Sequence, residues 1–217
     1  MGGGIFLLAV STFILPISAV VPVNSTIIIA SLFFRLVYFH RHILWDISRP
    51  FALGSIVGAV VGVQTFSLLS EFAILVMLGL TILAMLWMPP IKIRANLPMP
   101  FLWLGAVHTW LSAITGLGGL LQGYLLRGKH ARQAIVGTIA ACMFWMSILK
   151  IIGYIWVGFD YGPYLTIILL AILASFLGTW VGKRFLGYIT DDQFRWGMRL
   201  ILTLMAVRLF WVAWSIY

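Results

Sequence analysis

The chain has 217 residues, of which 63% are hydrophobic and 9% are charged, and its mean hydropathy is +1.10. This balance excludes a water-soluble globular domain. A membrane-spanning helix takes about 20 apolar residues, so the length allows roughly seven crossings and no sizeable domain outside the bilayer. The formal net charge of +9 comes from Lys and Arg scattered at predicted helix ends, which favours anchoring against anionic lipid over nucleic-acid binding.

Prolines interrupt the first apolar stretch, residues 5–23, at Pro16 and Pro22. Proline in a membrane segment frees backbone groups that protein or cavity water must satisfy. We therefore expect a short half-helix followed by a longer helix at residues 26–39. The rest of the first half is predicted to hold a basic loop at residues 35–49, helices at 50–69 and 72–88, and a stop at Pro89-Pro90.

The second half is predicted to hold helices at residues 101–126, 133–157, 163–181 and 193–216, with a basic turn at 127–132. Trp and Tyr gather near the ends of the segments, as in the aromatic belts of membrane proteins. Under this topology the 14 Lys and Arg residues divide equally, with Arg41 on one membrane face and Arg132 on the other. The positive-inside rule then predicts no orientation.

An internal repeat is the most informative pattern. Small residues four positions apart, which let helices approach closely in lipid, recur at a constant offset of 120 residues: Gly54, Gly58 and Gly62 match Ala174, Gly178 and Gly182. The same offset carries Ser70-Glu71 onto Thr190-Asp191. Each pair is predicted to begin a last helix with an N-cap and an acid, and Thr190 with Gln193 makes a capping box.

Glycine clusters come earlier in both halves. Gly2-Gly3-Gly4 is followed by Ser25-Thr26, and Gly116-Leu117-Gly118-Gly119 is followed by Gly137-Thr138. The predicted fold is therefore all-α: a polytopic transmembrane helix bundle with an internal tandem repeat and broken or re-entrant helices at the glycine clusters. Within one integral membrane domain we expect a first repeat at residues 1–90, incomplete at its N-terminus, a polar linker at 91–100 and a second repeat at 101–217.

This order of motifs resembles the sulfite exporter TauE/SafE family of membrane transporters over nearly the whole chain. The resemblance implies transport of a small sulfur-containing anion, such as sulfite or an organosulfonate, across a bacterial inner membrane. Met1 falls inside the first glycine motif, so the helix that precedes it in the family is expected to be absent from this chain. The alternative is a non-transporting structural or assembly subunit, or half of a split transporter.

The anion site is predicted where glycine turns expose backbone N–H groups and polar side chains add donors. The candidate residues are Gly2, Gly3, Gly4, Thr26, Gly116, Gly118, Gly119, Thr138 and Lys150. Tight helix packing remains an alternative for the glycines, bonding to their own helices for the Thr pair, and snorkelling to the interface for Lys150. Snorkelling is the preferred interpretation for Arg35 and Arg208.

His108 is interpreted as a hydrogen-bonded structural histidine, with a proton relay as the alternative. The five acids, Asp46, Glu71, Asp160, Asp191 and Asp192, are read as loop or cap residues. Whether a proton or sodium is coupled to transport, and whether the chain forms a homo-oligomer or needs a partner subunit, is left open.

No pattern indicates an enzyme. His40 and His42 stand in a basic loop, and the only cysteine, Cys142, lies in an apolar run with no His or Asp near it in the sequence. Nucleophilic catalysis needs a base beside the nucleophile, and a zinc site needs several spaced ligands. We therefore expect no catalytic residue, cofactor or metal site.

Overall fold

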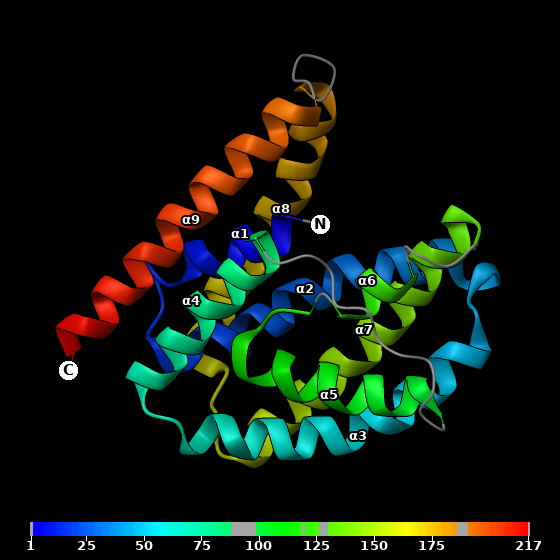
Figure 1. Ribbon diagram of the computed structural model, residues 1–217, viewed down its shortest axis with the longest axis horizontal. Coiled ribbons are helices and arrows are strands. Elements are labelled where there is room, and N and C mark those ends of the chain that lie inside the picture. Colours follow the sequence, from blue (N-terminus) through cyan, green and yellow to red (C-terminus); the bar gives the residue numbers. More distant parts are fainter. Residues whose placement is uncertain (1, 88–98, 119, 126–129, 186–190, 217) are drawn as a thin grey trace.

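The computed structural model describes residues 2–87, 99–118, 120–125, 130–185 and 191–216, and within these ranges all regular secondary structure is helical (Figure 1). The elements are α1 (Gly2–Ser11), α2 (Ile17–Phe39), η1 (His40–His42), α3 (Trp45–Leu68), α4 (Glu71–Trp87), α5 (Pro100–Thr115), α6 (Leu120–Leu125), α7 (Arg132–Trp156), η2 (Gly162–Tyr164), α8 (Leu165–Phe185) and α9 (Asp191–Ile216). The prediction of an all-α bundle is confirmed.

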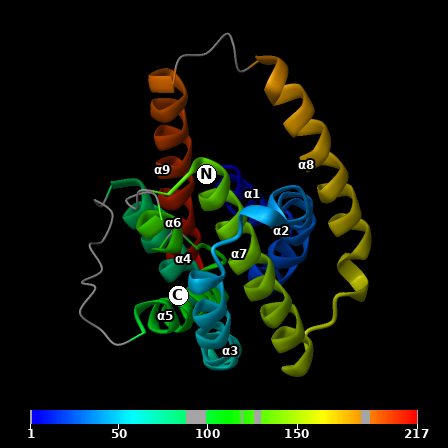
Figure 2. The ribbon, with the colours of Figure 1, turned by 90° about the vertical axis from the view of Figure 1, so that its right-hand side faces the viewer.

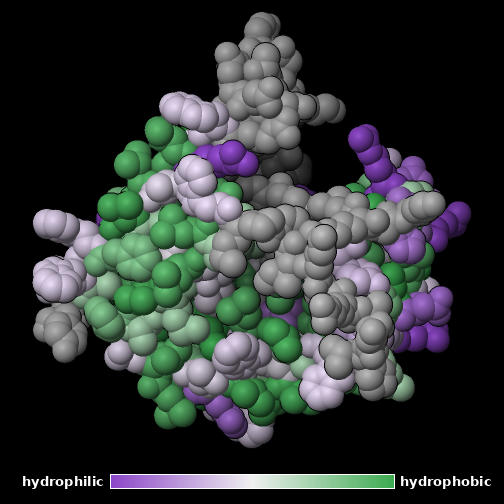
Figure 3. Space-filling view, in the orientation of Figure 1, coloured by the Kyte–Doolittle hydropathy of each residue, from purple (hydrophilic) through white to green (hydrophobic). Residues whose placement is uncertain are grey.

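The surface is that of a protein in lipid. Three helical segments, Ile17–His42, Trp45–Leu68 and Arg132–Trp156, are long and apolar enough to cross a membrane. Large apolar side chains are exposed along α8 and α9, for example Leu173 and Trp211. Figure 3 shows hydrophobic residues over much of one face, while hydrophilic residues gather at its right-hand end. Such an apolar exterior marks a surface that is covered by lipid or protein.

In the first half the helix breaks earlier than the sequence suggested. The break falls at residues 12–16, and α2 begins directly after Pro16, whose φ of −54° suits proline. Pro22, expected to lie in the break, is instead buried inside α2. The side chains of Asn24, Ser25 and Thr26, just after it, each donate a hydrogen bond to a carbonyl of the same helix. The half-helix is thus α1.

In the second half, the helix breaks at the second glycine cluster, as expected, so the single segment predicted at residues 101–126 is wrong. Gly116 ends α5 in the left-handed conformation, with a φ of 69°, and its N–H bonds the Ser112 carbonyl at 2.9 Å. Glycine adopts this conformation without the strain that a Cβ brings. The chain then turns back, since Leu121 of α6 bonds His108 and the Tyr124 ring lies 5.2 Å from that of Phe101. Helices α5 and α6 form a hairpin.

The loop between α2 and α3 lies beside the start of α7. The Leu44 N–H donates to the Thr138 hydroxyl at 3.0 Å, and η1 packs against α7. Arg41 and Arg132, which the sequence interpretation put on opposite faces, therefore lie at the same end of the bundle. The equal division of charge rested on the wrong topology of residues 101–126 and no longer holds.

Helices at corresponding places in the two halves pack antiparallel. The Phe39 carbonyl near the end of α2 faces Gly137 at the start of α7, while Ser25 and Lys150 share a cavity further along. Gly79 of α4 packs on the Phe210 ring of α9, and the Trp87 indole donates to Thr203 at 3.3 Å. Figure 2 shows α2 and α7 side by side near the centre, with α8 standing to one side.

Candidate anion site at the helix break

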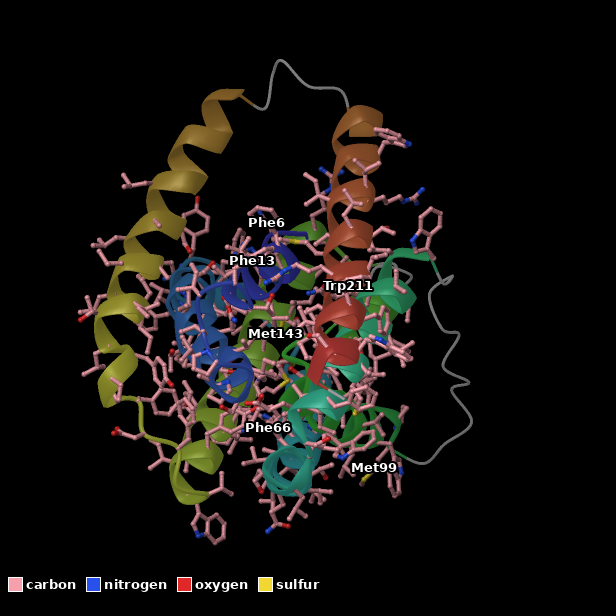
Figure 4. All side chains as sticks on the ribbon, turned by 90° about the vertical axis from the view of Figure 1, so that its left-hand side faces the viewer. Phe6, Phe13, Phe66, Met99, Met143 and Trp211 are labelled. Carbon is pink, nitrogen blue, oxygen red and sulfur yellow. The ribbon has the colours of Figure 1, made fainter. Side chains whose placement is uncertain are left out.

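A small cavity of about 40 Å³ lies where α2, α5 and α7 meet. Its lining residues are Ser25, Ile28, Leu32, Ser112, Gly116, Gly118, Met143, Met146, Ser147 and Lys150. Met143 lies near the middle of the bundle in Figure 4. Ser25, Ser112 and Lys150 are each at most 3% exposed, so the cavity lies in the interior of the membrane domain, next to the break that follows α5.

Among the described residues of this lining, Lys150 supplies the only charged side chain. It is 3% exposed, and its amino group donates a hydrogen bond of 3.1 Å to the Ser112 hydroxyl. No carboxylate lies in ion-pair contact with it among the described residues. Burying an ammonium without a counter-charge costs free energy. An anion in the cavity would offset that cost.

The break after α5 shapes the cavity. Gly116 and Gly118 both line it, and the turn that contains them sends α6 back along α5. The carboxyl end of α5 carries partial negative charge. The Lys150 ammonium lies beside that end through Ser112, so Lys150 also has a structural partner in the helix terminus.

The predicted site residues divide into two groups. The cavity brings together Gly116, Gly118 and Lys150, from the second half of the chain. Gly4, Thr26 and Thr138 are not among the described residues that line it. Gly2, Gly3 and Gly4 belong to α1, and a Cβ on Gly4 would meet only the Ile28 side chain, at 3.9 Å. Gly119 lies outside the described residues.

The two threonines, which the repeat pairs with each other, have unlike surroundings. The Thr26 hydroxyl donates to the Val23 carbonyl of its own helix at 2.6 Å. The Thr138 hydroxyl is fully buried and accepts the Leu44 N–H at the end of the bundle. Both contacts are with backbone groups. Only that of Thr26 matches the alternative of bonding to its own helix, since Leu44 lies 94 residues from Thr138.

The two arginines that the sequence interpretation assigned to snorkelling, Arg208 and Arg35, are not among the residues that line the cavity. Arg208 is half-buried in α9, donates to the Thr12 hydroxyl at 3.1 Å and stacks on the Phe13 ring, with 3.4 Å between the guanidinium carbon and the ring centroid. Arg35 is exposed on α2. Of the acids, Asp46, Glu71 and Asp160 are exposed; Asp191 begins α9.

Sequence reasoning missed the polar and sulfur groups around Lys150. Ser147 and Met143 lie one and two turns before Lys150 on α7, and Ser112 lies one turn before Gly116 on α5. A helical spacing of three or four residues from Lys150 and from the glycine break would have indicated them. Ser25 belonged to a noted motif, but Thr26 beside it was chosen.

Comparison with known proteins agrees with this architecture. The Sulfite exporter TauE/SafE family matches residues 1–209 of the 217. Among curated proteins and solved structures, none matches the chain. The family match covers both halves, including the break after α5, the cavity and Lys150. The chain belongs to the sulfite exporter TauE/SafE family and is a multi-pass membrane transporter.

Proposed function

We propose that the Lys150 cavity binds a small inorganic oxyanion, of the size of sulfite, during transport across the membrane. The observation that carries this proposal is the buried ammonium of Lys150, which faces the cavity beside the hydroxyls of Ser112 and Ser147. An oxyanion there would offset the desolvated positive charge and accept hydrogen bonds from these groups. Charge-assisted hydrogen bonds of this kind are roughly twice as strong as neutral ones.

The volume of the cavity favours a compact anion. One water molecule needs at least about 10–15 Å³ of cavity volume, so a cavity of about 40 Å³ admits roughly three water molecules. A single-sulfur oxyanion that displaces those waters fits this space. An organosulfonate carries a carbon chain in addition, and would need the neighbouring side chains of Met143 and Met146 to move apart. We therefore favour sulfite over organosulfonates.

The arrangement of the helices supports alternating access. We infer that residues 1–90 and 101–217 are inverted repeats joined by the linker, because α2 packs antiparallel on α7 and α4 on α9. Inverted repeats with broken helices at a central site are a recurrent transporter design. Rocking of one half against the other would expose the Lys150 cavity to each side in turn.

The location follows from charge. We infer a bacterial inner membrane, with the end that bears Arg35, Arg41, Arg49 and Arg132 in the cytoplasm, because cytoplasmic loops carry an excess of Lys and Arg. The connections at the opposite end carry the acids Glu71 and Asp160 and, in their described parts, neither Lys nor Arg.

Uptake of labelled sulfite into proteoliposomes tests the proposal. Lys150→Met keeps the length of the side chain but removes its charge. We expect the half-saturation concentration for sulfite to rise about tenfold or more, because a hydrogen bond to a charged group is worth about 1.5–3 kcal/mol. Arg208→Met is the matched control: it removes a membrane cation outside the cavity and should leave the half-saturation concentration within about twofold.

Two outcomes would contradict the proposal. A folded Lys150→Met protein with an unchanged half-saturation concentration would leave Lys150 only its structural role at the end of α5. Absence of saturable sulfite uptake by the unchanged chain would remove sulfite as substrate and favour the alternative of a partner-dependent subunit. Lys150→Arg, which keeps the charge, should retain more uptake than Lys150→Met if the anion is the partner.

A further inference from the structure

His108 has one satisfied and one unsatisfied ring nitrogen. Its side chain is 1% exposed in α5, and Nδ1 lies 3.3 Å from the backbone N–H of Leu121, at the start of α6. Nε2 is buried and makes no hydrogen bond with any described residue. A buried polar group without a partner is rare in folded proteins. The structural interpretation from sequence therefore accounts for only one of the two nitrogens.

The bond from Leu121 fixes which nitrogen carries the proton. A backbone N–H can donate only to an unprotonated ring nitrogen, so Nδ1 is the acceptor. The neutral ring then carries its proton on Nε2. The orphaned atom is thus a hydrogen-bond donor.

That donor lies beside the anion cavity. A Cβ on Gly118 would fall 2.6 Å from Nε2, and Gly118 lines the cavity. Met143, another lining residue, approaches the same point, since its terminal methyl group would lie 3.1 Å from that Cβ. Phe51 packs edge-on against the imidazole, with 5.6 Å between ring centroids. Nε2 is closed off from solvent and lies directly behind the cavity wall at Gly118, where no side chain stands between them.

His108 lies on α5 one turn from Ser112, the hydrogen-bond partner of Lys150. An anion between Gly118 and Ser112 would meet the Lys150 ammonium on one side and Nε2 on the other. Neutral donors that do not add a second positive charge are suited to a site that must also release its anion.

We propose that His108 is a second anion-binding residue of this cavity, donating a hydrogen bond from Nε2 to an oxygen of the transported oxyanion past Gly118. The inference rests on the proposed function of the Lys150 cavity. It adds a directional donor, which selects an anion with at least two acceptor oxygens over a spherical halide.

Two substitutions separate the roles of the two nitrogens. In His108→Asn the amide oxygen can replace Nδ1 as acceptor for Leu121, but nothing reaches the position of Nε2. In His108→Gln the amide nitrogen can replace Nε2 as donor. We expect the dissociation constant for labelled sulfite, measured on purified protein, to rise about tenfold in His108→Asn and to stay within about threefold in His108→Gln, as for one hydrogen bond to a charged group.

A purely structural histidine would give the opposite order. His108→Asn would then bind sulfite as the unchanged chain does, and that result would overturn the inference. Thermal unfolding in detergent, run on the same samples, establishes that each variant is folded. If His108→Asn does not fold, the inference is tested by sulfite binding to His108→Gln and by the nitrogen spectrum of the unchanged protein.

The nitrogen spectrum reports on Nε2 directly. In protein labelled with ¹⁵N-histidine, the His108 signals are those that His108→Gln lacks. Sulfite should shift the Nε2 signal, whereas chloride at the same ionic strength should leave it in place. An Nε2 signal unmoved by saturating sulfite would overturn the inference.

The same titrations distinguish the two proposals. If Lys150→Met binds sulfite normally and His108→Asn binds it more weakly, only the proposed role of Lys150 is contradicted. If Lys150→Met binds sulfite more weakly and His108→Asn binds it normally, only the proposed role of His108 is contradicted. If the unchanged chain shows no saturable binding, both proposals are wrong.

Discussion

Helices α3 and α8 carry the same spacing of small residues but have different neighbours. On α3, Gly54 and Gly58 lie directly against the backbone of α5, so that a Cβ on Gly58 would fall 2.2 Å from the Ala106 carbonyl oxygen. On α8, a Cβ on Gly178 would meet nothing within 4 Å. The two glycines are separated by the repeat offset of 120 residues.

The difference shows that a small-residue face does not by itself bring a helix to it. The partner of α3 has its own gap at the contact: a Cβ on Gly105 of α5 would fall 2.2 Å from the Phe51 carbonyl oxygen. Close approach in lipid needs small residues on both helices. The described part of the chain offers no helix with such a gap beside Gly178.

The largest effect is expected when alanine replaces glycine at the contact between α3 and α5. Gly58→Ala places a methyl group against backbone atoms of Ala106 that cannot rotate away, and we expect it to destabilise the protein by about 3 kcal/mol, at the upper end for overpacking. Gly178→Ala adds the same group to open space and should be neutral or stabilise by up to about 1 kcal/mol through helix propensity. Equilibrium unfolding in detergent measures both.

Equal losses of stability in the two variants would contradict the comparison, since they would mean that the face of α8 is packed as closely as that of α3. Gly105→Ala provides the check from the other side of the contact. It should resemble Gly58→Ala, because its added methyl group meets the Phe51 backbone.

A smaller effect is expected at the turn that ends α5. Gly116→Ala forces a Cβ into the left-handed conformation and against the Leu8 side chain, 2.1 Å from its Cδ1. Left-handed strain costs about 1–2 kcal/mol, and the Leu8 terminus is flexible enough to yield, so we expect a loss of about 2 kcal/mol. Gly158→Ala is the matched control, since its φ is 89° but its Cβ would meet nothing within 4 Å.

The comparison of these two glycines separates strain from contact. Both variants should be less stable because of the added backbone strain. Only Gly116→Ala should also weaken sulfite uptake, because Gly116 lines the cavity. A Gly116→Ala protein as stable as the unchanged chain would show that the turn after α5 does not require glycine. Uptake unaffected by Gly116→Ala would place the turn outside the working site.

Sequence alone predicted local features better than contacts between distant segments. The glycine spacing at residues 116–119 indicated a broken helix because a positive φ is a local requirement. The direction of α6 after that break depends on Leu121 and Leu125 packing against Ile47 and Phe51, which no local pattern encodes. The equal division of basic residues between the two membrane faces, which left the orientation unpredicted, followed from this one turn.

The site was predicted in part for the same reason. Lys150 stood out because an ionisable residue in an apolar helix is costly. Thr26 and Thr138 were paired by the repeat, but one bonds its own helix and the other bonds a loop 94 residues away. Ser112 and the Nε2 of His108 gain their importance only from where α5 and α7 meet.

The smallest expected effect concerns the starts of α4 and α9. The Ser70 hydroxyl accepts the Ala73 N–H at 3.3 Å and so caps α4, as predicted; Ser70→Ala should destabilise the protein by about 1 kcal/mol. Thr190, its counterpart at the repeat offset, lies outside the described residues, and the repeat predicts a similar loss for Thr190→Ala. Ser67→Ala is the control, because that hydroxyl donates to the Gln64 carbonyl within α3 and caps no helix. A loss at Ser70 without one at Thr190 would mean that the two halves share their helix order but not their capping, and would confine the repeat to the packing of the helices.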